Sequence, residues 1–156
     1  MVTGPRSTSA VLDASSFVRA VDPESGDERA RAWLEAIAGG RLDASVPDVF
    51  FLEVTNTFTK LIRAGRLEPQ AAEDALGFAH SLELSVIETR DIVWEILAAA
   101  LDTGLSAYDA SYVVVAARAD AVLVTADRRL ADTASRSALL PWVGPEDVFG
   151  DSEGDA

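Results

Sequence analysis

The sequence predicts an α/β fold, a three-layer α/β/α sandwich with a five-stranded parallel sheet at its centre. Three observations support this prediction. Short apolar runs alternate along the chain with segments of helical spacing. The runs are apolar throughout rather than at every second position, which is typical of parallel strands covered on both faces. With 156 residues, 49% of them hydrophobic, the chain is long enough for one domain with a sizeable core.

Five runs of four or five residues are the strand candidates. They are residues 10–13, 42–46, 84–87, 121–124 and 139–143, of which the last is the weakest. The segments between them have apolar residues at helical intervals. Gly39 and Gly65 end two of these segments, and Pro47 and Pro69 stand in the first turn of two others. The expected helices cover residues 14–19, 27–38, 47–64, 69–81, 89–102, 106–118 and 126–134.

Composition divides the chain into three parts and excludes several functions. Residues 1–9 are expected to be a mobile polar lead-in, residues 10–149 the folded domain, and residues 150–156 an acidic tail. The chain has no cysteine, which excludes disulfide scaffolds, cysteine-rich zinc sites and thiol catalysis. We find no signal peptide and no apolar run long enough to cross a membrane, and so expect a cytoplasmic protein.

The charge balance limits how the protein handles nucleic acid. Thirteen basic residues stand against 26 acidic ones, giving a net charge of −13. A general binder of phosphate backbones needs clustered Lys and Arg, which this chain lacks. Any contact with nucleic acid must therefore be local or depend on bound cations.

Four acidic residues occupy positions that a solvated surface does not explain. Asp13 ends the first apolar run and Asp127 follows the fourth, so both are expected at the carboxyl ends of parallel strands, where open α/β sheets bind ligands. Glu53 interrupts the apolar stripe of its helix. Asp109 does the same in a stripe that includes Tyr108 and Tyr112.

Each of these acids also has a plainer interpretation. Asp13 and Asp127 suit helix N-caps, and Ser106 with Asp109 matches a capping box. Glu53 is expected about two turns inside the helix that begins at Pro47, beyond the reach of the N-terminal amides, so its alternative is a buried ion pair with an Arg.

If the four acids converge, they predict a cation site. Two carboxylates about 5 Å apart repel by roughly 3 kcal/mol at an effective dielectric constant near 20, so the cluster needs raised pKa values or a cation. Oxygen ligands without Cys or a suitably spaced His favour Mg²⁺ or Mn²⁺ over zinc. This site suits phosphodiester hydrolysis by a metal-activated water.

Over residues 10–149 the sequence resembles the PIN-domain ribonucleases, among them the VapC toxins of bacterial toxin–antitoxin pairs. The segments that carry the resemblance are VLDAS at 11–15, LEVTN at 52–56, RAGRL at 63–67, LSAYDASY at 105–112 and LVTADRRL at 123–130. The resemblance implies the strand order 3-2-1-4-5, one or two Mg²⁺ or Mn²⁺ ions, and endonucleolytic cleavage of RNA. It also implies a cognate antitoxin and commonly a homodimer.

Carried over residue by residue, the resemblance implies that the principal metal ion is bound or positioned by Asp13, Glu53 and Asp109. Asp127 would complete the site, through water or a second ion. Thr125, Asn56 and Ser15 are the expected supporting residues, although Asn56 is equally well explained as a helix-surface residue and Ser15 as a cap. The candidate RNA contacts are Arg19, Arg63, Arg66, Arg128 and Arg129.

Trp33 and Trp94 lie within helical apolar stripes, so we expect them in the core or in an interface. The alternative to a nuclease is a PIN-like module that binds RNA or protein without cutting, which the four acids disfavour.

Overall fold

Four parallel strands form the centre of the fold in the computed structural model, which describes residues 9–136. β1 (Ser9–Leu12) lies between β2 (Asp43–Pro47) and β4 (Val122–Val124), and β3 (Leu84–Ile87) pairs with the far side of β2. The order β3-β2-β1-β4 confirms the expected order for these four strands. The fifth strand expected at 139–143, residues 1–8 of the lead-in and the acidic tail lie outside the described residues.

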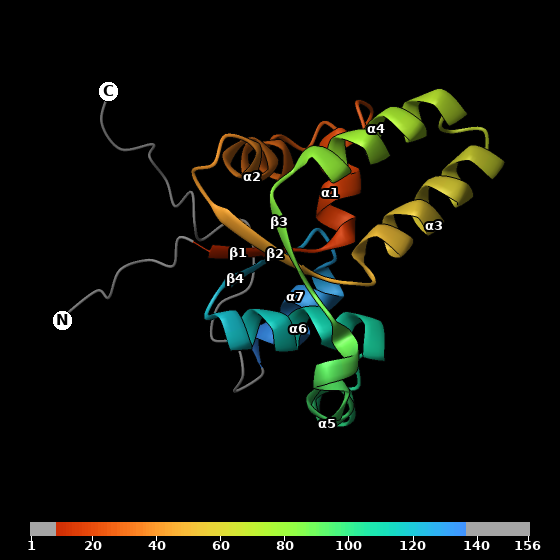
Figure 1. Ribbon diagram of the computed structural model, residues 1–156. Coiled ribbons are helices and arrows are strands. Elements are labelled where there is room, and N and C mark those ends of the chain that lie inside the picture. Colours follow the sequence, from red (N-terminus) through yellow and green to blue (C-terminus); the bar gives the residue numbers. More distant parts are fainter. Residues whose placement is uncertain (1–8, 137–156) are drawn as a thin grey trace.

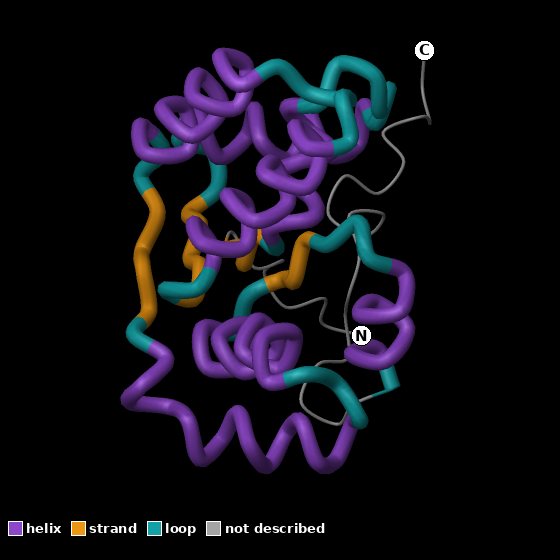
Figure 2. The backbone as a smooth tube through the Cα atoms, turned by 90° about the vertical axis from the view of Figure 1, so that its right-hand side faces the viewer, coloured by secondary structure: helices purple, strands orange, loops and turns teal. Residues whose placement is uncertain are grey.

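Helices cover both faces of this sheet, which gives the expected three layers (Figure 1). The first four helices lie on one side, and α5 and α6 lie on the other, as the turned view also shows (Figure 2). The helices are α1 (Ala14–Val21), α2 (Glu28–Ala38), α3 (Phe50–Arg63), α4 (Pro69–Ser81), α5 (Val93–Thr103), α6 (Ala107–Ala119) and α7 (Arg128–Ser135), with a short 3-10 helix, η1 (Thr89–Ile92), before α5.

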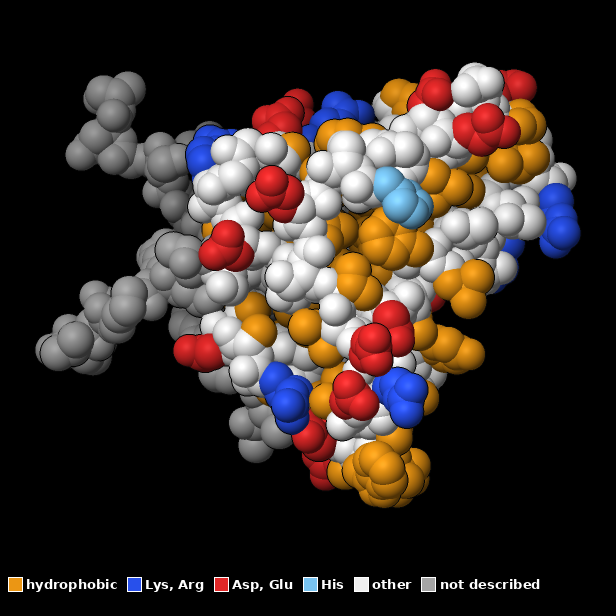
Figure 3. All heavy atoms as spheres, viewed as in Figure 1, with side chains coloured by type: hydrophobic (Ala, Val, Ile, Leu, Met, Phe, Trp, Pro, Cys, Tyr) orange, Lys and Arg blue, Asp and Glu red, His pale blue; other side chains and the backbone are white. Residues whose placement is uncertain are grey.

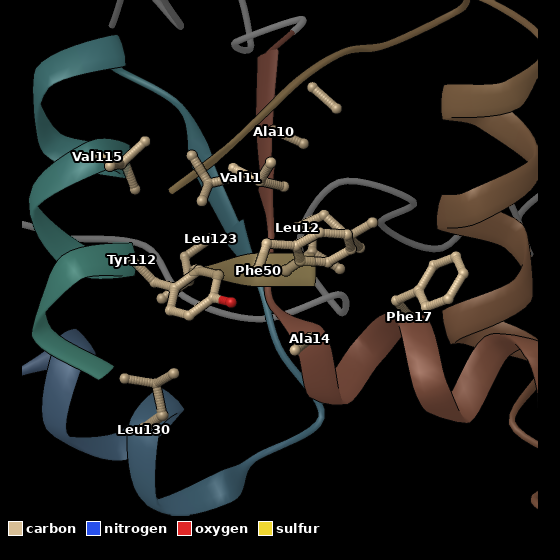
Figure 4. Packing of buried hydrophobic residues seen from close by; sticks show 14 of the residues in the cluster. Ala10, Val11, Leu12, Ala14, Phe17, Phe50, Tyr112, Val115, Leu123 and Leu130 are labelled. Atoms are coloured by element: carbon tan, nitrogen blue, oxygen red, sulfur yellow. The ribbon is translucent and has the colours of Figure 1, made fainter. Parts of the chain in front are cut away.

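The core lies on both sides of the sheet. Val11, Leu12 and Leu123 of the central strands are almost completely buried, as the continuous apolar runs predicted. Trp33 is fully buried under the first helical layer, which confirms the expectation for that residue. Figure 4 shows residues from β1, β4, α1 and α6 packed around the ends of these strands.

Pro47 was expected in the first turn of a helix, and this prediction is wrong. It is the last residue of β2, where it pairs with Ile87, and α3 begins only at Phe50. A proline at the end of a strand is tolerated because few ladder hydrogen bonds remain to be made there. Glu53 therefore lies in the first turn of α3 rather than two turns inside the helix.

Trp94, expected in the core or in an interface, and Tyr108, expected on a core-facing stripe, are both exposed in this chain. Trp94 in α5 is 78% exposed, and Tyr108 in α6 is 60% exposed. Figure 3 shows hydrophobic side chains gathered over α5, at the lower end of the molecule. The period of a helix shows that residues share a face, but not which element packs against that face.

Candidate active site

All four singled-out acids line one pocket of about 330 Å³ at the carboxyl ends of the strands. Asp13 follows β1, Asp127 follows β4, Glu53 comes from α3 and Asp109 from the first turn of α6. The pocket is lined by Asp13, Ala14, Ser15, Val18, Arg19, Glu53, Thr57, Asp109, Ala126 and Asp127. The topology thus brings together side chains that are up to 114 positions apart (127 − 13).

Asp13 is buried at the floor of the pocket, with 4% of its surface exposed. Its Oδ2 accepts hydrogen bonds from the hydroxyls of Ser15 (2.5 Å) and Thr125 (2.7 Å). These hydroxyls in turn accept the backbone N–H groups of Ala126 (3.1 Å) and Asp127 (3.0 Å). The two supporting residues expected beside Asp13 therefore lie in contact with it.

These hydrogen bonds do not fully compensate for the burial of Asp13. Burial raises the pKa of the Asp13 carboxyl, the hydroxyls of Ser15 and Thr125 lower it, and the charges of Asp109 and Asp127 raise it again. The side chain of Asp13 does not cap α1, so the capping alternative is not realised for this residue.

Glu53 has a raised pKa for related reasons. Burial is the largest cause, followed by the charges of Asp13 and Asp109, and together they raise the pKa of Glu53 from 4.5 to about 7. The hydroxyl of Tyr112 offsets part of this rise. Within residues 9–136, the Oε1 atom of Glu53 is buried without a hydrogen-bond partner, so it does not form the ion pair with an Arg that was the alternative.

Asp109 and Asp127 combine a structural role with their place in the pocket. The Asp109 N–H donates to the Ser106 hydroxyl (3.1 Å), so Ser106 caps α6 as expected. Asp127 caps α7, because its Oδ1 accepts the N–H groups of Arg129 (2.9 Å) and Leu130 (3.2 Å). The capping interpretation of Asp127 is therefore correct, and it is compatible with a role in the pocket.

Burial and the charge of Asp127 raise the pKa of Asp109, whereas the Ser106 hydroxyl and the charge of Arg129 lower it. Three of the four acids thus have raised pKa values in one small pocket. Such shifts cluster at functional sites, where repulsion among carboxylates is relieved when a cation binds.

The donor set fits a hard divalent cation. Four carboxylates face one pocket, and the buried Oε1 of Glu53 has an unused acceptor. Oxygen donors of this kind suit Mg²⁺ or Mn²⁺. Within the described part of the chain, no three His, Asp or Glu side chains are already arranged to hold an ion, so binding requires their side chains to draw together.

The basic and amide candidates are less well grouped than the acids. Arg19 lines the pocket and pairs with Asp27 (2.9 Å), and Arg129 is close enough to Asp109 to influence its pKa. Asn56, which follows Glu53 by one turn, is exposed and is not among the lining residues. The remaining candidates are exposed side chains that do not line the pocket: Arg63, Arg66 and Arg128.

Thr57 in the pocket and Tyr112 beside Glu53 were not among the site residues predicted from the sequence. Thr57 lines the pocket, and its hydroxyl donates to the backbone carbonyl of Glu53 (3.0 Å). Tyr112 was predicted only as part of an apolar stripe, and its ring is indeed fully buried. Its position three residues after Asp109 could have indicated that it lies near the site, because residues at that spacing share a helix face.

The chain is similar to known proteins over most of its length. The family model described as PIN domain matches residues 10–136. Ribonuclease VapC9 of Mycobacterium tuberculosis is 36% identical over 126 residues, which cover 79% of this chain and 89% of that protein. Ribonuclease VapC3 of Pyrobaculum aerophilum is 30% identical over 124 residues, which cover 78% of this chain and 92% of that protein.

Solved structures share the fold at lower identity. PAE2754 from Pyrobaculum aerophilum aligns with a TM-score of 0.66 at 24% identity, over 88% of this chain and 84% of that one. VapBC2 from Rickettsia felis, bound to a DNA fragment from its promoter, aligns with a TM-score of 0.60 at 16% identity, over 86% of this chain and 96% of that one. At these identities the likeness concerns the fold alone.

Proposed function

Because the chain belongs to the PIN-domain family, and within it to the VapC-like proteins, we propose that it is a metal-dependent endoribonuclease and the toxin of a toxin–antitoxin pair. The observation that carries the proposal is the convergence of Asp13, Glu53, Asp109 and Asp127 on one pocket. The names of the relatives supply the substrate class, which is RNA.

The ion proposed for this pocket is Mg²⁺ or Mn²⁺, one or two in number, held by the four acids. When bound, such an ion supplies activation of water and screening of the charge on a phosphate. Asp13 is the most firmly oriented of the four, because Ser15 and Thr125 both donate to its Oδ2 and leave Oδ1 for other partners. Its burial keeps bulk water away from this part of the site.

The residues around the acids orient the RNA. Arg19 lies on the wall of the pocket and supplies positive charge for a phosphate next to the scissile one. Arg129 lies close enough to Asp109 to lower the pKa of that acid. Because the chain carries a net charge of −13, we expect RNA binding to weaken when divalent ions are removed and when salt is raised.

Cleavage of RNA by the purified protein in Mn²⁺ tests this function. Wild-type protein is expected to cut single-stranded RNA, and Asp13→Asn or Asp109→Asn is expected to abolish cutting while circular dichroism stays unchanged. Wild-type protein that folds, leaves varied RNA intact and shows no thermal shift with Mn²⁺ would establish the binding-only module instead.

The proposed partner of the toxin is a cognate antitoxin. The toxin is proposed to act in the cytoplasm, where its RNA substrate is found. Two of the structural neighbours are named as VapBC2 and FitAcB. In residues 9–136, no helix is long and apolar enough to span a bilayer. A short reading frame next to this gene whose product co-purifies with the chain and stops cleavage would identify the antitoxin.

We also propose that the protein is a homodimer that pairs through α5. Trp94, Leu97 and Leu101 follow one another at intervals of three and four residues and are 78%, 59% and 78% exposed. This spacing places them on one helical face, which packs well against a copy of itself. Trp94 alone exposes on the order of 200 Å² of mostly apolar surface.

The charges that flank this face favour a second copy as its occupant. Arg90, in η1 just before α5, and Asp102, near the end of α5, are both exposed, and Arg90 lies 3.9 Å from its neighbour Asp91. An antiparallel pair of α5 helices brings Arg90 of one copy near Asp102 of the other. Leu97→Glu is expected to convert a dimer to a monomer in analytical ultracentrifugation, and a wild-type protein that is monomeric at high concentration contradicts the proposed pairing.

A further inference from the structure

Two buried polar side-chain atoms, one in the pocket and one beside it, have no hydrogen bond of standard geometry. Within residues 9–136, the orphaned buried side-chain atoms are Oε1 of Glu53 and the hydroxyl oxygen of Tyr112. One is an acceptor and the other carries a donor proton, and they come from α3 and α6, on opposite sides of the sheet. Buried polar groups are normally paired, so two orphans at one site require an explanation.

The hydroxyl of Tyr112 lies among the acids rather than in an apolar part of the core. Figure 4 shows Tyr112 extending from α6 with its hydroxyl directed toward the start of α1. Glu53, Asp13 and the backbone of Ala14 all lie close to it. A phenolic O–H is able to donate one hydrogen bond.

Glu53 is the acceptor that this donor fits. Asp13 already accepts two hydroxyl protons on Oδ2, from Ser15 and Thr125. Glu53 has a buried Oε1 with no donor, although the same side chain lines the pocket. One oxygen of this carboxylate thus faces protein while the group as a whole borders the space where a cation binds.

We propose that Tyr112 is a positioning residue whose hydroxyl donates to Oε1 of Glu53 and thereby turns the rest of that carboxylate toward the cation. The inference rests on the proposed function, because it assigns a cation to the pocket. Neighbours that hydrogen-bond to metal ligands fix their orientation, and losing one typically weakens metal affinity about 10-fold to 100-fold. A phenylalanine fills the same space, so packing alone does not explain the hydroxyl.

Calorimetric titration of the full chain with Mn²⁺ tests this role without any need for RNA. Tyr112→Phe is expected to raise the dissociation constant about 10-fold or more. Tyr108→Phe is the matched control, because it removes the same hydroxyl from the same helix at a side chain that is 60% exposed. The control is expected to bind Mn²⁺ as the wild type does. Equal affinity in all three proteins overturns the inference.

A double-mutant cycle tests whether Tyr112 acts through Glu53. If it does, adding Tyr112→Phe to Glu53→Gln weakens Mn²⁺ binding less than Tyr112→Phe does alone. Fully additive effects contradict the assignment, because they show that the Tyr112 hydroxyl acts independently of Glu53.

The outcomes also separate this inference from the proposed function. If the wild-type protein binds no Mn²⁺, the proposed cation site is refuted, and the proposed nuclease function with it. If the wild-type protein binds Mn²⁺ and cuts RNA, and Tyr112→Phe does both equally well, the proposed nuclease function stands. Only the role proposed for Tyr112 is then refuted.

Discussion

The Thr125 hydroxyl donates a 2.7 Å hydrogen bond to Oδ2 of Asp13 across 112 positions of sequence. This bond joins the end of β4 to the end of β1. Asp13 follows β1 and Asp127 follows β4, so the bond connects the two strands that these acids follow. The same hydroxyl accepts the N–H of Asp127 (3.0 Å), so its proton is directed at Asp13. Thr125 therefore links two acids of the pocket through one oxygen.

Replacing Thr125 by Val tests this link, because Val has the same shape but no hydroxyl. We expect Thr125→Val to lower the free energy of unfolding at neutral pH by about 1–3 kcal/mol, since it leaves a buried carboxylate short of a donor. Thr125→Ser is the control and is expected to retain most of the stability. Urea unfolding measures both, and equal stability of the two variants would show that the bond contributes little.

Asp127 has two roles, and two substitutions separate them. Asp127→Asn keeps an N-cap for α7 and is expected to unfold like the wild type, whereas Asp127→Ala is expected to lose about 1 kcal/mol of stability. Both variants are expected to lose Mn²⁺ affinity and RNA cleavage, because both remove the carboxylate. Full cleavage by Asp127→Asn would leave capping as the sole role of this residue.

The raised pKa of Glu53 predicts how stability depends on pH without metal. The folded protein binds this proton more tightly than the unfolded chain, so the contribution is fully present below the ordinary pKa of 4.5 and is lost as pH rises to about 7. We expect the unfolding temperature to fall across this window, and less so in Glu53→Gln. A flat profile in the wild type would contradict the raised pKa.

Divalent ions are expected to reverse this loss. Protons compete with Mg²⁺ or Mn²⁺ for the carboxylates, and this competition is weaker at pH 8 than at pH 5 because the pKa of Glu53 is about 7. Added Mn²⁺ should therefore raise the unfolding temperature more at pH 8 than at pH 5. Thermal unfolding in chelator and in Mn²⁺ at both values checks this, and an equal rise at both would point to binding elsewhere on the acidic surface.

Arg19 and Arg63 form a matched pair for locating the path of RNA. Arg19 lines the pocket, whereas Arg63 ends α3 and is exposed outside it. Arg19→Ala is expected to raise KM for RNA and to reduce the salt slope of binding by about one. Its exposed pair with Asp27 limits the cost in stability to about 1 kcal/mol or less. A larger effect of Arg63→Ala would place RNA along α3.

The order of the four described strands and the gathering of the four acids were both predictable from the sequence. Asp13 and Asp127 each follow a continuous apolar run, and the carboxyl ends of parallel strands lie on one edge of the sheet. Glu53 and Asp109 were visible as acids within apolar stripes. These signals are local, and the parallel topology turns them into a single site.

The mistaken expectations share one physical cause, because each depended on what packs against a residue. Pro47 suits a helix start as well as a strand end, and only its pairing with Ile87 decides. Tyr108 obeys the helical period of a stripe expected to face the core and is nevertheless exposed. The hydroxyl of Tyr112 was missed because the periodicity of a helix counts a tyrosine as apolar and does not register where its oxygen lies.

The pocket draws its acids from position 13 to position 127, so no shorter piece of the chain contains the complete set. During translation, most of the polypeptide must leave the ribosome, and β4 must join the sheet, before the last carboxylate is in place. The complete set of acids is therefore assembled late in synthesis, once β4 has paired with β1.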